Sequence, residues 1–503
     1  MFKSPILEAK TSIGKNVDVD VVAVSQDAGK KLQASKGPYG PILAKFKKGE
    51  SFAGAAGSTQ LVWFAGKKGA ASALFVGVGP AAQLTEEKFR VAGGAAWARL
   101  AADKVKSASI QVDSLAISKE ISKTRAVRAF AEGLVLAAYQ INSHKKEQKA
   151  VPQVRLVFVT SDKKFQKELD AEIKQVAAIG DAVLVTRNWS NEPSNIGTPE
   201  FYAAEAKKLA AEYGLKCKIL TEKEAAAEKM GLFLAVGQGA EREGRIVVLE
   251  YAPKSPSKDA KTIALVGKGV TFDSGGISIK PSMRMEEMKH DMTGAATIVG
   301  SILLASAWQV PNKIVAILAF TENMPDGNAI QPGNVIASRN GKTVEIINTD
   351  AEGRLILADV LDYAHEWEPD VILNAATLTG AVSIALGKQC AGIMGNDDDL
   401  IEKVRAAGAV NGERLWQLPL YDEYFEDLKS DYADMKNSAN DSYGGTIRGA
   451  AFLKQFIKPG YKWAHLDIAA VANGVTHLSY YPKRGASGAH VRTLAQFAAD
   501  FRG

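Results

Sequence analysis

Strand-like and helix-like segments alternate through the second part of the chain, and this alternation most limits what the chain can fold into. Six short apolar runs predict buried strands: Cys217 to Leu220, Arg245 to Tyr251, Thr262 to Val266, Lys313 to Phe320, Val344 to Ile347 and Val371 to Ala375. Helical patterns lie between them, notably over Met285 to Ala307 and Arg354 to Trp367. Buried strands with crossover helices predict an α/β fold whose sheet is mixed but largely parallel and flanked by helices.

The first part of the chain has an alternation of its own. Its predicted strands are Val19 to Val24, Leu61 to Phe64, Ala73 to Val78 and Val154 to Val159, with helices over Glu86 to Ala102 and Ser122 to Tyr139. A chain of 503 residues is too long for one ordinary core. We therefore predict an N-terminal α/β domain over residues 1–160, a linker helix over 161–187 and a second α/β domain over 188–503.

The sequence shows no sign of a secreted, membrane-spanning or cysteine-ligated metal protein. The start of the chain has no apolar run of signal-peptide type, and no run reaches the ~20 uninterrupted apolar residues of a membrane helix. The two cysteines, Cys217 and Cys390, form no metal-binding pattern. We expect a reduced, cytoplasmic protein without a membrane partner, with a disulfide between them as the alternative.

The net charge of +6 is unevenly distributed. Residues 1–160 carry 24 Lys+Arg and 12 Asp+Glu, which gives +12, so the remainder carries 38 and 44, which gives −6. A basic N-terminal part could bind nucleic acid, and DNA binding is an alternative or second role. We favour an ordinary solvated surface, because the lysines form no recognisable nucleic-acid motif.

The stretch from Asn348 to Leu355 reads Asn-Thr-Asp-Ala-Glu-Gly-Arg-Leu and follows a predicted strand. Asp350, Glu352 and Arg354 are therefore expected on a strand-to-helix turn, where α/β proteins place their chemistry. Two carboxylates with an arginine beside them suit a metal site next to an anion site. The alternative is a capped helix start, with Asn348 or Thr349 as the cap.

Two further loops can supply partners for these carboxylates. The glycine-rich run from Gly267 to Pro281 places Lys268 and Asp273 just beyond the strand that ends at Val266. An ion pair between Lys268 and Asp273 is the alternative there. Asp291 lies at the mouth of an apolar helix, where a buried carboxylate is costly without a cation. Converging carboxylates repel one another unless cations neutralise them, and two divalent ions would also activate a water.

Several strings in this half of the chain resemble the leucyl (cytosol) aminopeptidase family, in order and at family spacing. They begin at Gly267 (Gly-Lys-Gly-Val-Thr-Phe-Asp-Ser-Gly-Gly), Met288 (Met-Lys-His-Asp-Met), Asn348, Ala376 (Ala-Thr-Leu-Thr-Gly-Ala), Gly444, His465 (His-Leu-Asp-Ile-Ala) and Gly485. The resemblance covers residues from about 188 to the end. The first 160 residues correspond to the variable domain of the family and add little support.

The resemblance implies a role for each matching residue. Lys268, Asp273, Asp291 and Glu352 would hold the tighter metal ion. Asp273, Asp350 and Glu352 would hold the more exchangeable one, with Asp350 also offering its backbone carbonyl. Lys268 must then be a neutral amine, so its pKa must fall, and two nearby cations with burial would cause that. Zn or Mn is expected, with Mg or Co as alternatives.

The resemblance also implies how the substrate is held and cleaved. Lys280 would stay charged and polarise the scissile carbonyl, and Arg354 would bind a bicarbonate that shuttles the proton. The first substrate pocket would be lined by Met288, Thr377, Leu378, Gly380, Ala469 and Ala472. Ala472 is smaller than the methionine that some relatives carry. His290 is expected to be a hydrogen-bonded spectator rather than a metal ligand.

The expected function is therefore a metal-dependent leucyl aminopeptidase. It would release N-terminal leucine and other apolar residues from peptides with a free amino group, and the resemblance implies a homohexamer. A phosphoesterase built on the same two-metal site is a further reading. The amine-binding geometry argues against it.

Overall fold

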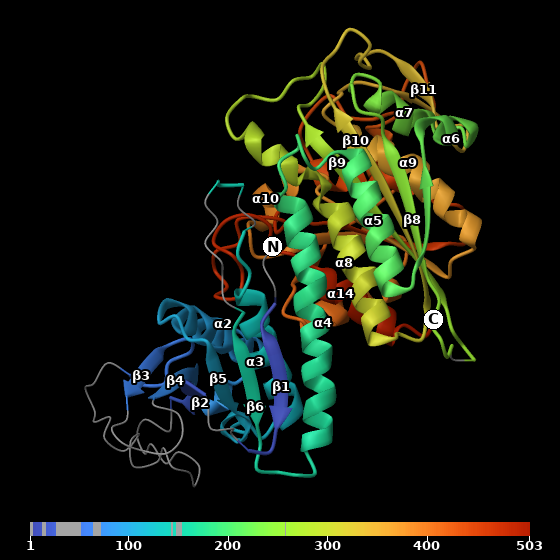
Figure 1. Cartoon of the computed structure of the whole chain (residues 1–503). Helices are drawn as coiled ribbons and strands as arrows, with labels where there is room; N and C mark the ends of the chain where they lie inside the picture. The colour runs from blue at the N-terminus through green and yellow to red at the C-terminus, as the bar shows by residue number, and fades with distance from the viewer. Residues whose placement is uncertain are drawn as a thin grey trace. The chain divides into compact units, whose positions relative to one another are not determined.

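The computed structural model describes residues 4–12, 17–26, 52–63, 72–141, 144–146, 153–256 and 258–503 (Figure 1). The chain divides into two compact units, residues 1–184 with 476–483, and residues 185–475 with 484–503. The boundary falls inside helix α4 (Gln166–Asn191), which continues four residues beyond the predicted end at Arg187. Of the predicted features, Phe64 and residues 1–3 lie outside the described residues.

The first unit is an α/β domain built on a six-stranded sheet in the order β1-β6-β5-β2-β4-β3. The strands are β1 (Ile6–Lys10), β2 (Val19–Ser25), β3 (Thr59–Trp63), β4 (Ser72–Gly79), β5 (Ser107–Gln111) and β6 (Arg155–Val159). All neighbouring strands run parallel except β3 and β4. Its helices are η2 (Ala81–Gln83), α2 (Glu86–Ala102), η3 (Val112–Leu115) and α3 (Lys123–Ala137). Strands β1 and β5 were not predicted, because both are short and carry few large apolar residues.

The second unit is organised by an eight-stranded mixed sheet in the order β15-β14-β17-β13-β9-β10-β8-β7. Its strands are β7 (Lys216–Leu220), β8 (Arg245–Tyr251), β9 (Thr262–Asp273), β10 (Lys313–Asn323), β13 (Val371–Ala376), β14 (Ala391–Gly395), β15 (Leu415–Gln417) and β17 (Lys462–Asp467). The central strand β9 is parallel to both neighbours, β10 and β13. The predicted fold class is confirmed, because the sheet is mixed, with a parallel centre and antiparallel pairs toward its edges.

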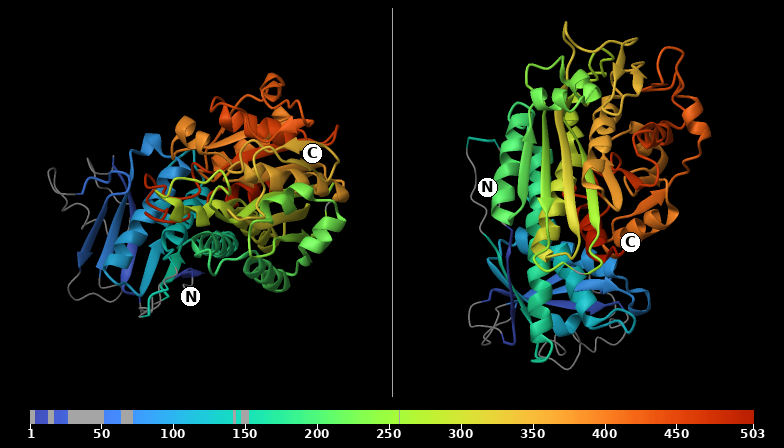
Figure 2. Two further views of the ribbon diagram at one scale, coloured as in Figure 1. Left: turned by 90° about the horizontal axis from the view of Figure 1, so that it is seen from above. Right: turned by 90° about the vertical axis from the view of Figure 1, so that its right-hand side faces the viewer.

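Helices cover both faces of this sheet (Figures 1 and 2). They are α5 (Pro199–Tyr213), α6 (Glu222–Ala227), α7 (Gly231–Gly237), η4 (Met285–Met292), α8 (Thr293–Trp308), α9 (Glu352–Tyr363), η5 (Ala364–Trp367), α10 (Gly380–Leu386), α11 (Asp398–Val410), α12 (Glu423–Glu426), α13 (Gly445–Lys454) and α14 (Val491–Asp500). Helices α5 and α8 pack against one face of the central strands, and α7 and α9 pack against the other. On that second face, Val266 and Ile317 share one apolar core with Leu355.

The segment Met285–Trp308 (η4 and α8) has the length and mean hydropathy, 1.2, of a membrane-spanning helix, but 89% of its 18-residue apolar window is buried inside the protein. Helix α8 contacts β9, β10 and β13, and α14 packs on it. Its apolar character is therefore accounted for by its place in the core.

One predicted strand does not belong to the main sheet. The run from Val344 forms β12 (Thr343–Glu345), which pairs with β11 (Val335–Ala337) and β16 (Met435–Lys436) in a separate three-stranded sheet. The expectation that Asp350 and Glu352 follow a strand of the main sheet is therefore wrong. A connection of six residues, 346–351, leads from β12 to helix α9.

Candidate metal centre and substrate pocket

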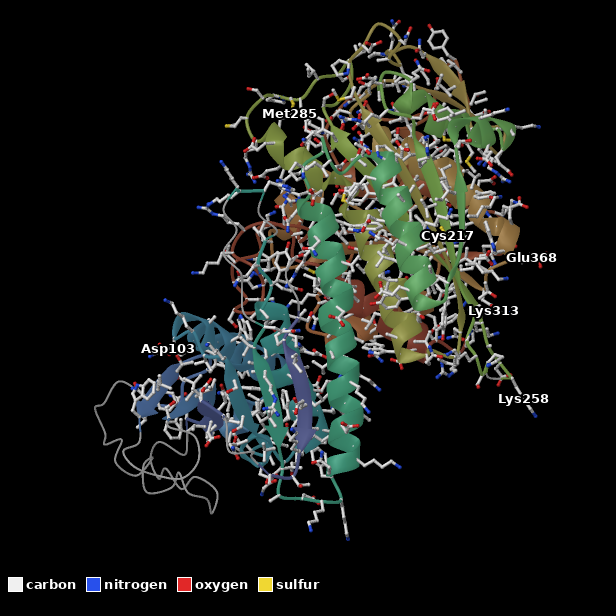
Figure 3. The ribbon with its side chains drawn as sticks, viewed as in Figure 1. Asp103, Cys217, Lys258, Met285, Lys313 and Glu368 are labelled. Atoms are coloured by element: carbon white, nitrogen blue, oxygen red, sulfur yellow. The ribbon has the colours of Figure 1, made fainter. Side chains whose placement is uncertain are left out.

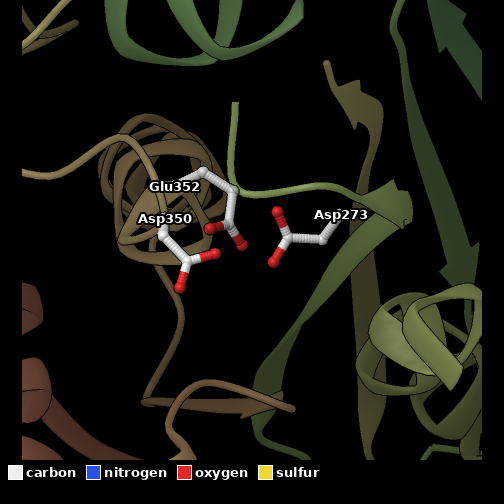
Figure 4. Close-up of side chains that lie close together, drawn as sticks. All are labelled: Asp273, Asp350 and Glu352. Atoms are coloured by element: carbon white, nitrogen blue, oxygen red, sulfur yellow. The ribbon is translucent and has the colours of Figure 1, made fainter. Parts of the chain in front are cut away.

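Three carboxylates from two distant segments meet at the carboxyl end of the central strand. Asp273 is the last residue of β9, Glu352 is the first residue of α9, and Asp350 lies in the connection before α9. One carboxylate oxygen from each lies within 4.8 Å of the others (Figure 4). Asp291, in η4, joins them through Lys268. The predicted convergence of four carboxylates is thus present in the structure.

Lys268 lies inside β9 and not beyond its end, because this strand extends to Asp273. Its ammonium lies 2.6 Å from Asp291 and 2.9 Å from Glu352, and it donates to the carbonyl of Thr377 at 3.0 Å. The alternative ion pair with Asp273 is not formed. Burial alone would lower the pKa of Lys268, but the charges of Asp291, Glu352 and Asp273 outweigh it and raise the pKa above its ordinary value. The neutral amine of a metal ligand therefore requires cations nearby.

Lys280 enters the same cluster from the other side. Its ammonium lies 2.8 Å from Asp273 and also contacts Asp350. Burial acts to lower the pKa of Lys280, but the charges of Asp273, Glu352 and Asp350 raise it above the ordinary value. The carboxylates of the metal-free cluster therefore favour the charged form of Lys280.

The carboxylates carry more negative charge than the two lysines neutralise. Burial, and then the charges of neighbouring carboxylates, raise the pKa values of Asp291, Asp350 and Glu352 above their ordinary range, against the opposing lysines. Asp291 Oδ2 and Asp350 Oδ1 accept no well-formed hydrogen bond within the described residues, although each lies against a lysine. Carboxylate oxygens that carry uncompensated negative charge are suitable ligands for divalent cations. The residues therefore fit the metal centre that the sequence predicts.

The connection that carries Asp350 is held by contacts far away in the sequence. The hydroxyl of Thr349 donates to the carbonyl of Gly275 at 2.6 Å and accepts from the amide of Ser278 at 2.8 Å. Gly275 has a φ of +87°, and a Cβ there would lie 2.8 Å from Asp350 Oδ1. The alternative of an ordinary capped helix is wrong, since Ala351 is the N-cap and makes no side-chain cap bond. Thr349 instead binds the loop of Gly275 and Ser278.

Arg354 is buried one turn into α9 and has no carboxylate partner within hydrogen-bonding distance among the described residues. Its Nη1 donates to the carbonyl of Asn437 at 2.8 Å, and its Nε has no hydrogen-bond partner in the described chain. Burial lowers the pKa of Arg354 to about 10, although the charges of Glu352 and Asp467 raise it. A buried guanidinium with an open N–H group can bind a small anion.

An open pocket of about 580 Å³ adjoins the carboxylates. It is lined by all the predicted metal ligands, by Lys280 and by all six predicted substrate-pocket residues, Met288, Thr377, Leu378, Gly380, Ala469 and Ala472. Arg354 is not part of this lining. His290 Nδ1 lies 2.5 Å from the carbonyl of Ser190, which agrees with the predicted spectator role.

Three site residues were not found by sequence reasoning. Asn323, the last residue of β10, donates to Asp273 Oδ1 at 2.8 Å and to the carbonyl of Thr349 at 3.0 Å. Its place at the end of a parallel neighbour of β9 could have identified it. Asn437 directly follows β16. Its side-chain oxygen accepts from the amide of Ile347 at 2.8 Å, and its carbonyl accepts from Arg354.

The third is Asp467, at the end of β17. It accepts from Leu378 at 3.2 Å, from the hydroxyl of Thr379 at 2.6 Å and from Ala469 at 3.3 Å, so it joins the two loops that line the pocket. Asn437 gives no local signal, because its partner Ile347 lies 90 residues away. Asp467 lies inside the matched string His-Leu-Asp-Ile-Ala, but the sequence does not reveal its contact with Leu378, 89 residues away.

Two family models match the chain. Residues 184–495 match the model described as "Cytosol aminopeptidase family, catalytic domain". Residues 21–148 match that described as "Cytosol aminopeptidase family, N-terminal domain". The first match contains every predicted site residue, and the second shows that the N-terminal part also has its counterpart in the family.

Relatives and a solved structure resemble nearly the whole chain. A "Probable cytosol aminopeptidase" of Azotobacter vinelandii is 39% identical over 500 residues, which cover 98% of this chain and 99% of the relative. One of Syntrophotalea carbinolica is 41% identical, with 88% and 89% covered. The solved structure "Bottromycin maturation enzyme BotP in complex with Mn" is 32% identical, with a TM-score of 0.85, covering 97% of this chain and 100% of that one.

Proposed function

This chain belongs to the cytosol aminopeptidase family, and from that membership we propose that it releases N-terminal leucine and other apolar residues from peptides. At the level of the family, it is a metal-dependent aminopeptidase. The observation that carries the finer proposal is the cluster of Asp273, Asp350 and Glu352 oxygens within 4.8 Å, flanked by two lysines and opening into a pocket.

We assign two divalent ions to this cluster. Glu352 and Asp273 would contribute to both ions, with Lys268 and Asp291 on one and Asp350 on the other. When bound, such a pair supplies an activated water as nucleophile and a Lewis acid for the carbonyl oxygen. The ions are proposed to be Zn or Mn, and the relative BotP was solved with Mn.

Two positively charged side chains, those of Lys280 and Arg354, would complete the site. The side chain of Lys280 is 21% exposed and lines the pocket, so it would keep its charge and stabilise negative charge on the scissile carbonyl oxygen. Arg354 would hold a bicarbonate that carries the proton between water and leaving group. The open Nε of Arg354 supports this assignment. Its guanidinium is planar, as the anion is.

The geometry of a free amino group explains why cleavage would stop at the first residue. A free peptide amine would serve as a metal ligand and an acylated amine would not, while Lys280 would contact the adjacent carbonyl. The apolar side chains of Met288, Ala469 and Ala472 in the pocket wall favour leucine-like groups. A single methylene shifts such a preference by only ~1–3 kcal/mol.

The decisive variant is Glu352→Ala, since one carboxylate would bridge both ions. We expect hydrolysis of leucyl p-nitroanilide to be abolished and metal content to fall, as measured by elemental analysis. Glu243→Ala is the matched control, because Glu243 is an exposed glutamate whose ion partner is Arg245. Substantial activity of Glu352→Ala in metal-replete buffer would refute the assignment. N-Acetyl-leucyl substrates should resist the wild-type enzyme.

Two further proposals concern partners and reaction class. The family resemblance leads us to propose a homohexamer. Six chains of 53.6 kDa would have a mass of about 320 kDa, which light scattering can measure. A phosphoesterase would instead hydrolyse p-nitrophenyl phosphate and ignore aminoacyl anilides, so both substrates belong in the first assay.

A further inference from the structure

One lysine of the substrate pocket has no role in the proposed chemistry. Lys388 follows helix α10, whose end is set by Gly387 at a φ of +63°. Its side chain lines the same pocket as Ala472 and Asn473, and its Nζ donates to the carbonyl of Asn473 at 3.1 Å. Lys388 therefore lies beside the wall assigned to the first side-chain pocket.

The charges around Lys388 leave this ammonium uncompensated. Two further charged residues that line the pocket, Arg284 and Glu287, form an ion pair with each other, with Nη2 of Arg284 2.7 Å from Oε2 of Glu287. Within the described part of the chain, no carboxylate forms an ion pair with Lys388. Burial lowers the pKa of Lys388, Glu287 opposes this, and Arg284 adds to it. An ammonium has three N–H donors, and the carbonyl of Asn473 uses one of them.

The walls next to Lys388 suit an aliphatic stem. Ala469 and Ala472 are small, Met288 is apolar, and the pocket has about 580 Å³ of space. A side chain with methylenes and a terminal anion would pack its stem on these residues and place its charge near Lys388. Such a charge-assisted hydrogen bond is stronger than a neutral one.

We propose that Lys388 is a specificity-determining residue that binds a carboxylate of the peptide substrate, namely the side chain of an N-terminal glutamate or aspartate. This inference rests on the proposed aminopeptidase function and widens its substrate class from apolar residues to acidic ones. The observation favouring the first residue is that Asn473, which holds Lys388, directly follows Ala472 of the predicted first pocket. The C-terminal carboxylate of a dipeptide is the other source of the same chemistry.

A purely structural role makes a different prediction. If Lys388 only ties the end of α10 to Asn473, its loss changes the activity toward all substrates by the same factor. Selectivity between substrates, and not activity itself, is therefore the informative measurement.

The experiment compares the metal-loaded full chain with three variants, Lys388→Met, Lys388→Arg and Lys313→Met. The values of kcat/KM are measured for glutamyl, glutaminyl and leucyl p-nitroanilides. Lys388→Met should lower the glutamyl-to-leucyl ratio by about tenfold or more, as expected for a hydrogen bond between charged groups. The glutaminyl-to-leucyl ratio should change much less. Lys388→Arg should keep most of the glutamyl activity, since the charge remains.

Lys313→Met controls for net charge alone. Lys313 is exposed at the start of β10, whereas Asn323 at the other end of this strand contacts Asp273. Ten residues of strand separate the two ends by roughly 33 Å. Figure 3 labels Lys313 and also Met285 of the pocket, which lie at opposite ends of this unit. The selectivity of Lys313→Met should equal that of the wild type.

Two further arms make the result decisive. In the first, kcat/KM is compared for leucyl-glycine and leucyl-glycinamide, which differ only in the C-terminal carboxylate. If Lys388→Met changes the ratio for this pair and not the glutamyl-to-leucyl ratio, Lys388 binds the C-terminal carboxylate and the side-chain assignment is overturned. Calorimetric titration with the hydroxamates of L-glutamate and L-leucine measures the same preference without turnover. If the wild type cleaves no aminoacyl substrate, the proposed function is contradicted. If Lys388→Met has the same glutamyl-to-leucyl ratios of kcat/KM and of affinity as the wild type, this inference is overturned.

Discussion

The two lysines of the proposed metal centre have different surroundings, and this difference supports the separate roles proposed for them. The side chain of Lys268 is 3% exposed and lies between Asp291 and Glu352, whereas that of Lys280 is 21% exposed and faces the pocket. Lys268 would hold an ion as a neutral amine more readily than Lys280, because the enclosed lysine has no solvent to retain its charge. Lys280 can keep its proton and meet the substrate.

Gly353 is the residue on which the position of Lys268 depends most directly. A Cβ at Gly353 would lie 2.4 Å from Cε of Lys268. We expect Gly353→Ala to displace the lysine, weaken metal binding and reduce kcat at least tenfold, with an overpacking cost of about 1–3 kcal/mol. Elemental analysis and steady-state kinetics measure these effects.

Gly327→Ala provides the control for Gly353→Ala. Gly327 is exposed, and a Cβ there would meet nothing within 4 Å. Its metal content and kcat should match the wild type. Equal behaviour of the two alanine variants would show that Lys268 can shift without loss of the site.

At the scale of the elements, Asp359 of α9 connects three parts of the second unit. One carboxylate oxygen accepts from Phe233 in the first turn of α7 at 2.9 Å, and the other accepts from Arg339 at 2.8 Å. Burial raises the pKa of Asp359 to about 7, against the backbone hydrogen bonds that lower it. This residue therefore links the packing of α7 on α9 to pH.

The sign of this pH dependence follows from the raised pKa. The folded protein binds the proton of Asp359 more tightly than the unfolded chain does, whose ordinary value is 3.8. The stabilising contribution is complete below about pH 4 and is lost as the pH rises through about 7. Urea unfolding at pH 5 to 8 should show a loss of up to a few kcal/mol. Asp359→Asn should lack this part of the slope. Parallel curves for the two proteins would contradict the prediction.

At the scale of the whole molecule, metal binding should add to stability. A bound ion stabilises the folded chain by about 3 kcal/mol when its concentration is a hundredfold above the dissociation constant. A chelator should therefore lower Tm and abolish activity, and added Mn²⁺ or Zn²⁺ should restore both. Calorimetry of Glu352→Ala, which should respond little to metal, tests whether the effect arises at this centre. An unchanged Tm in the chelated wild type would contradict it.

DNA binding by the N-terminal part remains a prediction. Many described basic residues of the first unit are paired with acids, among them Arg90 with Glu132, Arg128 with Glu172 and Arg155 with Glu8. We therefore expect only salt-sensitive binding, with any mobility shift on duplex DNA lost by about 200 mM salt. A shift that persists there and prefers one sequence would instead establish a DNA-binding role. The predicted cytoplasmic location and the domain limits 1–160, 161–187 and 188–503 also remain predictions.

Much of this protein could be derived from its sequence. The strands Arg245–Tyr251 and Val371–Ala376 and the helix Glu86–Ala102 follow from local apolar patterns. The convergence of carboxylates could be inferred from their apolar settings, whereas the full set of five proposed metal-binding residues and the two neighbouring cations came from the family resemblance. Membership of the family rests on the order and spacing of those motifs, which sequence comparison alone confirms.

The tertiary structure decided what local patterns cannot contain. It placed β12 in a separate small sheet, because its partners β11 and β16 include a segment some 90 residues away. It placed Lys268 inside β9, joined Thr349 to the loop of Gly275, and put Asn437 and Asp467 behind the site. It also brought Lys388, which forms no ion pair with the described carboxylates, to the pocket wall. Each of these depends on hydrogen bonds between residues far apart in the chain, which sequence periodicity does not encode.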